Sequence, residues 1–221
     1  MIVVIDGPAG AGKSTVARLL ARRLGCAYLD TGAMYRTLAL AAIEAGIPPE
    51  DGRSLGALAR ELELTILPGV DGEPDRITLG GRDVTDRIRT PQVTAVVSQV
   101  SAHPSVRDAL VDAQRSLVAR GDWVADGRDL GSVVWPDADV KVFLTADDRE
   151  RARRRHRELQ SRGESVDFDH VLDEVRRRDR HDSQRATSPL VVAADATVID
   201  CSDRTAEQVV DAIAALVATL T

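Results

Sequence analysis

The sequence predicts an α/β protein with a parallel sheet flanked by helices, and three observations indicate this class. Short apolar runs rich in β-branched residues recur along the 221 residues. They alternate with segments of helical periodicity, and a glycine-rich loop joins the first run to the first helix. Strands that alternate with helices usually form a parallel sheet covered on both faces.

The elements of this sheet are expected near both ends of the chain. Residues 2–5 form the first strand, and Val16, Leu19, Leu20 and Leu24 share one face of the helix that follows. Further strands are expected at residues 27–29, 123–125, 140–144 and 196–199. The last helix carries Val209, Ile213, Leu216, Val217 and Leu220 at helical spacing. We therefore expect a discontinuous core of residues 1–36 and 106–221.

Residues 37–105 break this alternation. They contain Pro48-Pro49 and a glycine-rich stretch at 68–74. Short strands are expected at 64–67, 76–79 and 82–84, and Gly80-Gly81 between the last two is a hairpin signal. We expect an inserted subdomain with a small antiparallel sheet.

Composition restricts the function classes. No apolar run approaches the roughly 18 residues needed to cross a bilayer, and Met1 leads directly into an apolar strand without a basic region. We therefore expect a cytoplasmic protein without a membrane partner. The formal charge of −6 argues against a nucleic-acid partner. Cys26 and Cys201 are expected to be small core residues.

The glycine-rich loop carries the strongest motif. Residues 7–14 match G-x-x-x-x-G-K-[ST] between an expected strand and an expected helix, which is the context of a P-loop. Its backbone N–H groups would surround phosphate oxygens, Lys13 would reach the β- and γ-phosphates, and Ser14 would ligate Mg²⁺. The ATP-binding residues predicted here are Gly7, Pro8, Ala9, Gly10, Ala11, Gly12, Lys13, Ser14 and Thr15. The alternative is a glycine-rich turn with a solvated lysine.

P-loop proteins include switches, motors and kinases, so other segments of the chain must decide between these classes. A guanine-nucleotide switch would need an Asn-Lys-x-Asp base reader, and this chain contains no asparagine and no Asp-x-x-Gly. These absences exclude the GTPase class. Asp126 ends an apolar strand and is expected to act on magnesium through water, the alternative being a cap for the following loop.

A second group of polar segments gives a more specific indication. These segments are Asp-Thr-Gly-Ala-Met-Tyr-Arg from Asp30, Asp-Gly-Arg-Asp-Leu-Gly from Asp126, and Arg-Asp-Arg-His-Asp-Ser-Gln-Arg from Arg178. Together with the P-loop they resemble bacterial cytidylate kinases, nearly from end to end. The resemblance implies ATP-dependent phosphorylation of CMP, with dCMP as a second acceptor and Mg²⁺ as cofactor. It also implies that residues 37–105 are the nucleoside-monophosphate-binding insert.

The resemblance also implies roles at matching positions. The predicted CMP-binding residues are Thr31, Arg36, Ser98, Arg107, Arg128, Asp129, Arg178, Asp182 and Arg185. Arg36, Arg128 and Arg185 look like clamps for the acceptor phosphate, and Arg178 and Asp182 like ribose or phosphate contacts. Ser98, Arg107 and Asp129 look like cytosine readers. A carboxylate can accept from the cytosine N4 amino group and an arginine can donate to N3 and O2, whereas uracil has a carbonyl at the first position. The alternative for each arginine is a surface salt bridge.

An arginine-rich segment at 149–165 is expected to form a lid. Residues 149–162 contain seven arginines and two glutamates on an expected helix. An arginine that arrives on closure would stabilise charge on the γ-phosphate oxygens, whereas the alternative is a solvated helix face. Candidates are Arg151, Arg154 and Arg155, and we expect Lys13, Arg128, Arg185 and Arg154 to be the catalytic residues.

Two other functions stay open at this point. One is a similar kinase that acts on UMP, dCMP or another monophosphate. The other is a regulatory or adaptor protein whose P-loop binds ATP without turnover. His103, His156, His170 and His181 fall outside a metal-ligand pattern, and we expect a monomer whose partners are ATP and CMP or dCMP.

Overall fold

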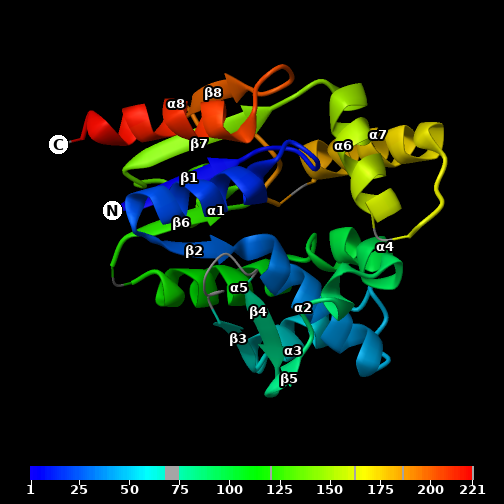
Figure 1. Ribbon diagram of the computed structural model, residues 1–221. Coiled ribbons are helices and arrows are strands. Elements are labelled where there is room, and N and C mark those ends of the chain that lie inside the picture. Colours follow the sequence, from blue (N-terminus) through cyan, green and yellow to red (C-terminus); the bar gives the residue numbers. More distant parts are fainter. Residues whose placement is uncertain (68–74, 120, 162, 186, 221) are drawn as a thin grey trace. The chain divides into compact units, whose positions relative to one another are not determined.

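The computed structural model describes residues 1–67, 75–119, 121–161, 163–185 and 187–220, and the chain divides into two compact units. The first unit comprises Met1–Leu29 and Gly121–Thr221, and the second Asp30–Arg120 (Figure 1). The glycine-rich stretch at 68–74 and Arg162 of the expected lid lie outside the described residues. None of the described helices is long and apolar enough to cross a membrane.

The first unit is built on a five-stranded sheet with the order β2-β6-β1-β7-β8. The strands are β1 (Ile2–Asp6), β2 (Ala27–Asp30), β6 (Trp123–Asp126), β7 (Val140–Thr145) and β8 (Thr197–Asp200). β1 pairs in parallel with both β6 and β7, so that Ile5 lies opposite Asp126 and Val142. The α/β class with a parallel sheet is thus confirmed.

Two helices cover one face of this sheet, α1 (Lys13–Leu24) and α8 (Ala206–Ala218). They pack side by side, α1 blue and α8 red in Figure 1. Leu20 and Ile213 are fully buried in the core that they share with the strands, Cys201 lies in this core, and Cys26 packs against it. The expected periodic residues therefore form the core, except that Leu220 lies beyond α8 and is exposed.

Two further helices of the first unit, α6 (Asp148–Ser161) and α7 (Phe168–Gln184), pack against each other. Leu159, Val171, Leu172 and Val175 form their small apolar core. A short π-helical turn at Leu130–Val134 follows the Asp-Gly-Arg-Asp segment after β6. The polar motifs of this unit thus lie next to strand ends or on α6 and α7.

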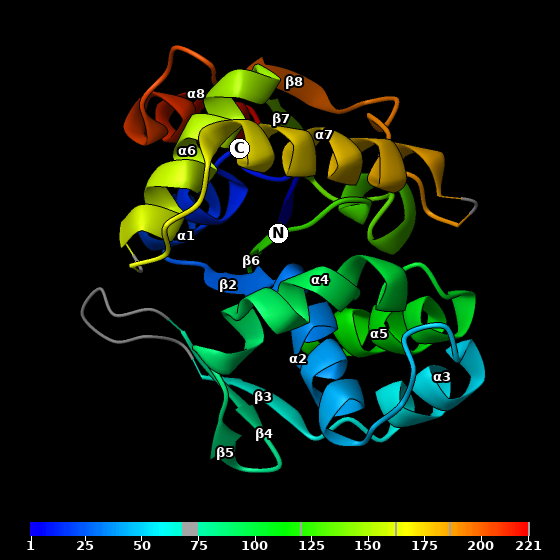
Figure 2. The ribbon, with the colours of Figure 1, turned by 90° about the vertical axis from the view of Figure 1, so that its right-hand side faces the viewer.

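The second unit consists of helices and a small sheet (Figure 2). The helices are α2 (Thr31–Glu44), α3 (Gly52–Arg60), the 3-10 turn η1 (Arg87–Arg89), α4 (Pro91–Val100) and α5 (Pro104–Leu117). The strands β3 (Leu64–Leu67), β4 (Arg76–Leu79) and β5 (Arg82–Asp83) are antiparallel, which confirms the small antiparallel sheet. Gly80 and Gly81 both have positive φ angles, 54° and 75°, in the hairpin expected there.

This unit is longer than the insert expected at residues 37–105. Asp30 caps α2 by accepting a hydrogen bond from the Ala33 N–H, and α2 packs on α4. α5 packs on α3, so α2 and α5 both belong to the core of this unit. The assignment of residues 37–105 as a monophosphate-binding insert, and of 149–165 as a lid, stays a prediction.

Candidate functional site

The loop between β1 and α1 has the backbone conformation of a tight glycine turn. Gly10 and Gly12 have φ angles of 76° and 91°, which other residues rarely adopt. At Gly7 the space for a side chain is filled by the carbonyl oxygen of Leu144, so a Cβ atom would clash there. These three positions therefore require glycine, and the loop leads directly into the N-terminus of α1.

Four basic side chains donate hydrogen bonds to the carbonyl oxygens of this loop. Lys13 Nζ donates to Pro8 at 2.9 Å and Arg128 to Gly7 at 2.9 Å. From α6, Arg151 donates to Ala9 at 3.2 Å and Arg154 to Ala11 at 3.4 Å. We call these four side chains, Lys13, Arg128, Arg151 and Arg154, the carbonyl clamp. They satisfy backbone acceptors of the loop and place four cations around it.

Lys13 is the cation of the clamp with the most perturbed environment. Burial lowers its pKa to about 7, and the positive charges of Arg128 and Arg178 act in the same direction. The carboxylates of Asp126 and Asp6 oppose the shift. A polyphosphate bound in the loop would favour the charged ammonium, because opposite charge nearby raises the pKa of a lysine.

A hydroxyl and a carboxylate meet beside the loop. Ser14 Oγ donates to Asp126 Oδ2 at 2.9 Å, and the hydroxyl of Tyr28 donates to Asp126 Oδ1 at 2.6 Å. The guanidinium of Arg18 lies over the Tyr28 ring at 5.5 Å. The sequence analysis names Ser14 and Asp126 as expected site residues but not Tyr28. The signal for Tyr28 was its place in β2, two residues before Asp30.

Asp6, at the end of β1, holds the segment that follows Asp129. Its two carboxylate oxygens accept hydrogen bonds from the N–H groups of Leu130 at 2.9 Å and Gly131 at 2.8 Å. Burial raises the pKa of Asp6 to about 6, although these two hydrogen bonds act in the opposite direction. Asp6 was also missed, and the signal was a carboxylate at the end of a buried strand.

The predicted residues of α7 and its C-terminal end lie near Arg128. Arg128 forms an ion pair with the buried carboxylate of Asp182, with Nε and Oδ2 3.3 Å apart. Arg185 Nε donates to the backbone oxygen of Asp182 at 3.4 Å. The first unit therefore brings Arg128, Asp182 and Arg185 together, and Arg178 is close enough to act on the pKa of Lys13.

In the second unit, the predicted residues come from three helices. Arg36, on α2, donates to the backbone oxygen of Ile88 at 3.2 Å and to Thr94 Oγ1, on α4, at 3.0 Å. Arg107, on α5, is buried, donates to the Ser101 oxygen at 3.4 Å, and lies over the Tyr35 ring at 5.5 Å. Thr94 and Tyr35 were not predicted.

Thr31 and Ser98 occupy different places in the same unit. Thr31 is buried at the first residue of α2, and Ser98 lies on α4, where its backbone oxygen accepts from Ser101 Oγ at 3.1 Å. Ser101 thus links the Ser98 backbone to Arg107, because its own oxygen accepts from that guanidinium.

The three candidate lid arginines differ in their partners. Arg151 and Arg154 belong to the carbonyl clamp, and Arg154 also donates to the backbone oxygen of Cys201 at 2.6 Å. Arg155 instead pairs with Glu158 on its own helix at 2.8 Å. Proximity to the loop therefore distinguishes the first two from the third.

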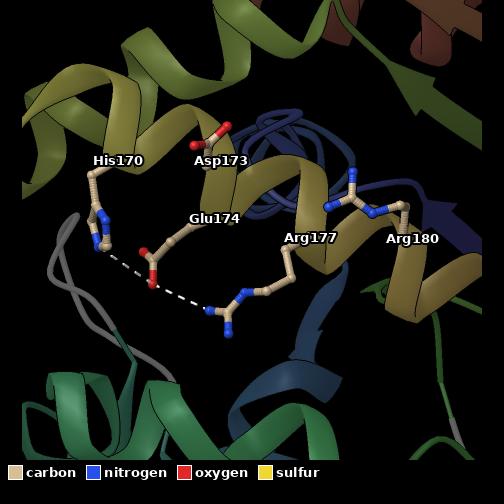
Figure 3. Close-up of a pocket in the computed structure, with 5 residues that line it drawn as sticks. All are labelled: His170, Asp173, Glu174, Arg177 and Arg180. Carbon is tan, nitrogen blue, oxygen red and sulfur yellow. Dashed lines mark hydrogen bonds and ion pairs between the residues drawn. The ribbon is translucent and has the colours of Figure 1, made fainter.

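A shallow hollow runs along α7 and is lined entirely by charged residues or histidine (Figure 3). These residues are His170, Asp173, Glu174, Arg177 and Arg180. Glu174 lies between His170 and Arg177, at 4.0 and 3.4 Å. None of the five is a predicted site residue, and their pairing along one helix is typical of a solvated face.

Comparison with known proteins relates nearly the whole chain to a single family. A family model described as cytidylate kinase matches residues 3–219. A cytidylate kinase of Carboxydothermus hydrogenoformans is 50% identical over 210 residues, which cover 95% of this chain and 94% of that protein. One of Mycobacterium leprae is 51% identical over 211 residues, 95% of this chain and 92% of that protein. One of Pseudomonas aeruginosa is 50% identical over 212 residues, 96% and 93%.

Proposed function

This chain belongs to the cytidylate kinase family, and we propose that it transfers the γ-phosphoryl group of ATP to CMP, giving ADP and CDP. We further propose that dCMP is an acceptor. The single observation that carries the donor side is the P-loop with Lys13 inside it and the Ser14–Asp126 pair beside it. A protein that only bound ATP would need no second group of phosphate-binding arginines.

The transfer itself requires positioning and charge more than proton chemistry. The acceptor is an ionised phosphate oxygen, so no general base is needed. Lys13, Arg128, Arg154 and Arg185 are the proposed catalytic residues, because their charges would offset the negative charge of the transferring phosphoryl group. The P-loop backbone N–H groups between Gly7 and Thr15, where Pro8 alone has none, would hold the other phosphates.

Magnesium is the proposed cofactor, and the residues present fit it. Among the described residues, no group of three or more His, Cys, Asp or Glu side chains could hold a metal ion. Magnesium needs no such group, since it is usually held by one or two protein oxygens, substrate phosphates and waters. Ser14 Oγ would hold the ion, with Asp126 acting through water. When bound, the ion would neutralise charge on the phosphate oxygens.

The acceptor side of the proposal rests on the residues that the family motifs carry. Arg36, Arg128 and Arg185 would bind the phosphate of CMP with Thr31 beside them, and Arg178 and Asp182 its ribose or phosphate. Ser98, Arg107 and Asp129 would read the base. Arg107 and Asp129 are both buried, and this supports a specific role, because side chains of these types are rarely fully buried without partners that require them.

The test is a coupled assay of ADP release with ATP and Mg²⁺, together with chromatography of the nucleotide products. We expect strong stimulation by CMP and dCMP, with the diphosphates as products, and little by UMP, AMP or no acceptor. Stimulation by UMP or AMP alone would show that the acceptor carries a different base from the one proposed here. ATP binding without any transfer product would favour a regulatory protein. A chelator should abolish transfer if magnesium is required.

The oligomeric state and the cellular location stay predictions. We expect a monomer in the cytoplasm without a nucleic-acid or membrane partner, and light scattering of the purified chain would test the first of these.

A further inference from the structure

Arg151 has the most buried side chain of the three arginines in the carbonyl clamp. Its Nε donates to the backbone oxygen of Ala146 at 2.9 Å, and Nη1 donates to Ala9 at 3.2 Å. The two terminal nitrogens also form a fork with Asp179, from Nη1 to Oδ1 at 3.0 Å and from Nη2 to Oδ2 at 2.7 Å. The residue is only 5% exposed. Four of the five N–H donors of the guanidinium therefore have protein acceptors.

This engagement conflicts with the role of a lid arginine. To reach a γ-phosphate, the Arg151 guanidinium would have to give up the fork with Asp179, whose planar two-bond geometry is among the strongest pairings of arginine. It would also release the Ala146 and Ala9 oxygens, whose hydrogen bonds would be lost. The hydrogen bonds of Arg151 therefore all go to protein acceptors, and one of these acceptors, the Ala9 oxygen, belongs to the phosphate loop.

The backbone of α6 also approaches the loop closely at this point. A Cβ atom at Gly10 would lie 3.0 Å from the Arg151 backbone oxygen and 3.1 Å from the Arg151 Cβ atom. The loop thus packs on the same residue whose side chain binds Ala9. A shift of Arg151 would displace both contacts, because protein interiors accommodate movement poorly.

We propose that Asp179 is a positioning residue for the nucleoside triphosphate. It fixes the Arg151 guanidinium on the Ala9 carbonyl oxygen, and so holds the P-loop in the conformation that receives the phosphates. Among the described hydrogen bonds and ion pairs, those of Asp179 are with Arg151, so its effect on the loop passes through that guanidinium. This inference rests on the proposed function, and it assigns Arg151 to holding the loop rather than to acting on the γ-phosphate. Arg154 also has protein acceptors but forms no two-bond fork with a carboxylate, so it stays the proposed catalytic arginine of α6.

The chain offers a matched control for this pair. Arg176 and Asp148 also join α7 to α6, with Arg176 Nε and Asp148 Oδ2 2.7 Å apart. Arg176 is exposed and Asp148 partly exposed, and among the described contacts neither side chain forms a hydrogen bond with the loop. A variant of Asp148 therefore reports what the loss of a helix-to-helix ion pair does by itself.

The experiment compares Asp179→Asn with Asp148→Asn. Equilibrium binding of ATP in the absence of acceptor, KM for ATP, KM for CMP and the thermal midpoint are measured for both. We expect Asp179→Asn to weaken ATP binding and raise KM for ATP by about tenfold to a hundredfold. Affinity for CMP should stay within about twofold. Asp148→Asn should leave all constants within about twofold, as surface pairs contribute little.

Asp179→Glu and Arg151→Lys complete the design. Asp179→Glu keeps a carboxylate able to accept from Arg151 and should recover part of the ATP affinity. Arg151→Lys keeps the charge but cannot form the fork, so it should lose ATP affinity like Asp179→Asn.

The inference would be overturned if Asp179→Asn and Asp148→Asn had the same affinity for ATP at a temperature where both variants are folded. Failure of both Asp179→Asn and Arg151→Lys to fold would also overturn it, since the pair would then serve the fold alone. If the wild type bound ATP but transferred nothing to CMP, the proposed function would fail, while the ATP-binding comparison would still decide the role of Asp179.

Discussion

The two units of the chain place their cations in different ways. In the first unit, Lys13, Arg128, Arg151 and Arg154 converge on the carbonyl oxygens of one loop, which the glycine motif shapes. In the second, Arg36 and Arg107 come from different helices, and each binds the backbone oxygen of a different residue and one neighbouring side chain or ring. In the first arrangement, side chains from several elements meet at a loop that a local motif shapes, whereas in the second the packing of helices gives each arginine separate partners.

This difference has a functional counterpart in our account. Lys13, Arg151 and Arg154 of the carbonyl clamp lie at the proposed donor site, so damage to them should affect transfer to every acceptor, whereas Arg128 is also a proposed contact of the acceptor phosphate. Arg36 and Arg107 are proposed acceptor contacts, so damage to them should depend on the acceptor and spare ATP.

The largest effect is expected from Lys13→Ala. It removes the cation inside the loop, and the loss of one preorganised charge of this kind lowers kcat by about 100-fold to 1,000-fold. The fall should be similar with CMP and dCMP, as measured by ADP release. Wild-type turnover in this variant would remove Lys13 from the mechanism.

A smaller and more selective effect is expected from Arg107→Met, which keeps the apolar stem and removes the charge. KM for CMP should rise about tenfold to a hundredfold, the loss of one or two charged hydrogen bonds, with KM for ATP nearly unchanged. Arg60→Met is the control, because Arg60 also donates to a backbone oxygen of the same unit, that of Gly56. Equal changes in both Michaelis constants would show that Arg107 is misassigned.

Asp129→Ala should behave like Arg107→Met although Asp129 belongs to the first unit. It removes a proposed base contact, so KM for CMP should rise far more than KM for ATP. The same steady-state assay measures this, and parallel losses for the two substrates would argue against Asp129 as a base reader.

ATP affinity should depend on pH through Lys13. Because its pKa is lowered to about 7, Lys13 is largely neutral in the unliganded protein above that pH and must take up a proton when the phosphates bind. Affinity should therefore fall as pH rises, by about fivefold between pH 7 and pH 8. Titration of ATP across this range measures it, and Lys13→Met should lose the dependence. If Lys13→Met kept the wild-type pH profile, the pH dependence of ATP affinity would have to come from another group.

The smallest effect is expected from Thr94→Val. This substitution removes the hydroxyl that accepts from Arg36 while it keeps the shape, so KM for CMP should rise by about threefold. Thr65→Val, on β3, is the control within the same unit. No difference between the two variants would show that Thr94 does not orient Arg36.

The fold class and the donor side could be predicted from the sequence for physical reasons that are local. The order of strands and helices gives a parallel sheet, and the P-loop motif places Lys13 and Ser14 at a helix N-terminus whatever surrounds them. Asp126 was also predictable, because it ends a strand. Tyr28 and Asp6 were missed, although each ends or precedes the end of a strand, since neither belongs to a motif.

The partners of the arginines could not be predicted. Nothing in the spacing of residues 149–162 shows that Arg151 forms a fork with Asp179, which lies 28 residues later on another helix. The same holds for Arg36 and Thr94, whose contact depends on the packing of α2 on α4. A charge pattern gives the number of cations on a helix, and only tertiary packing decides which backbone or carboxylate oxygen each one binds.

The most direct test of the separation between donor and acceptor residues is equilibrium binding of ATP and of CMP, each alone, to Lys13→Ala and Arg107→Met. The account predicts that Lys13→Ala loses affinity for ATP and keeps that for CMP, while Arg107→Met does the reverse. Loss of both ligands in both variants, with the fold intact, would contradict it.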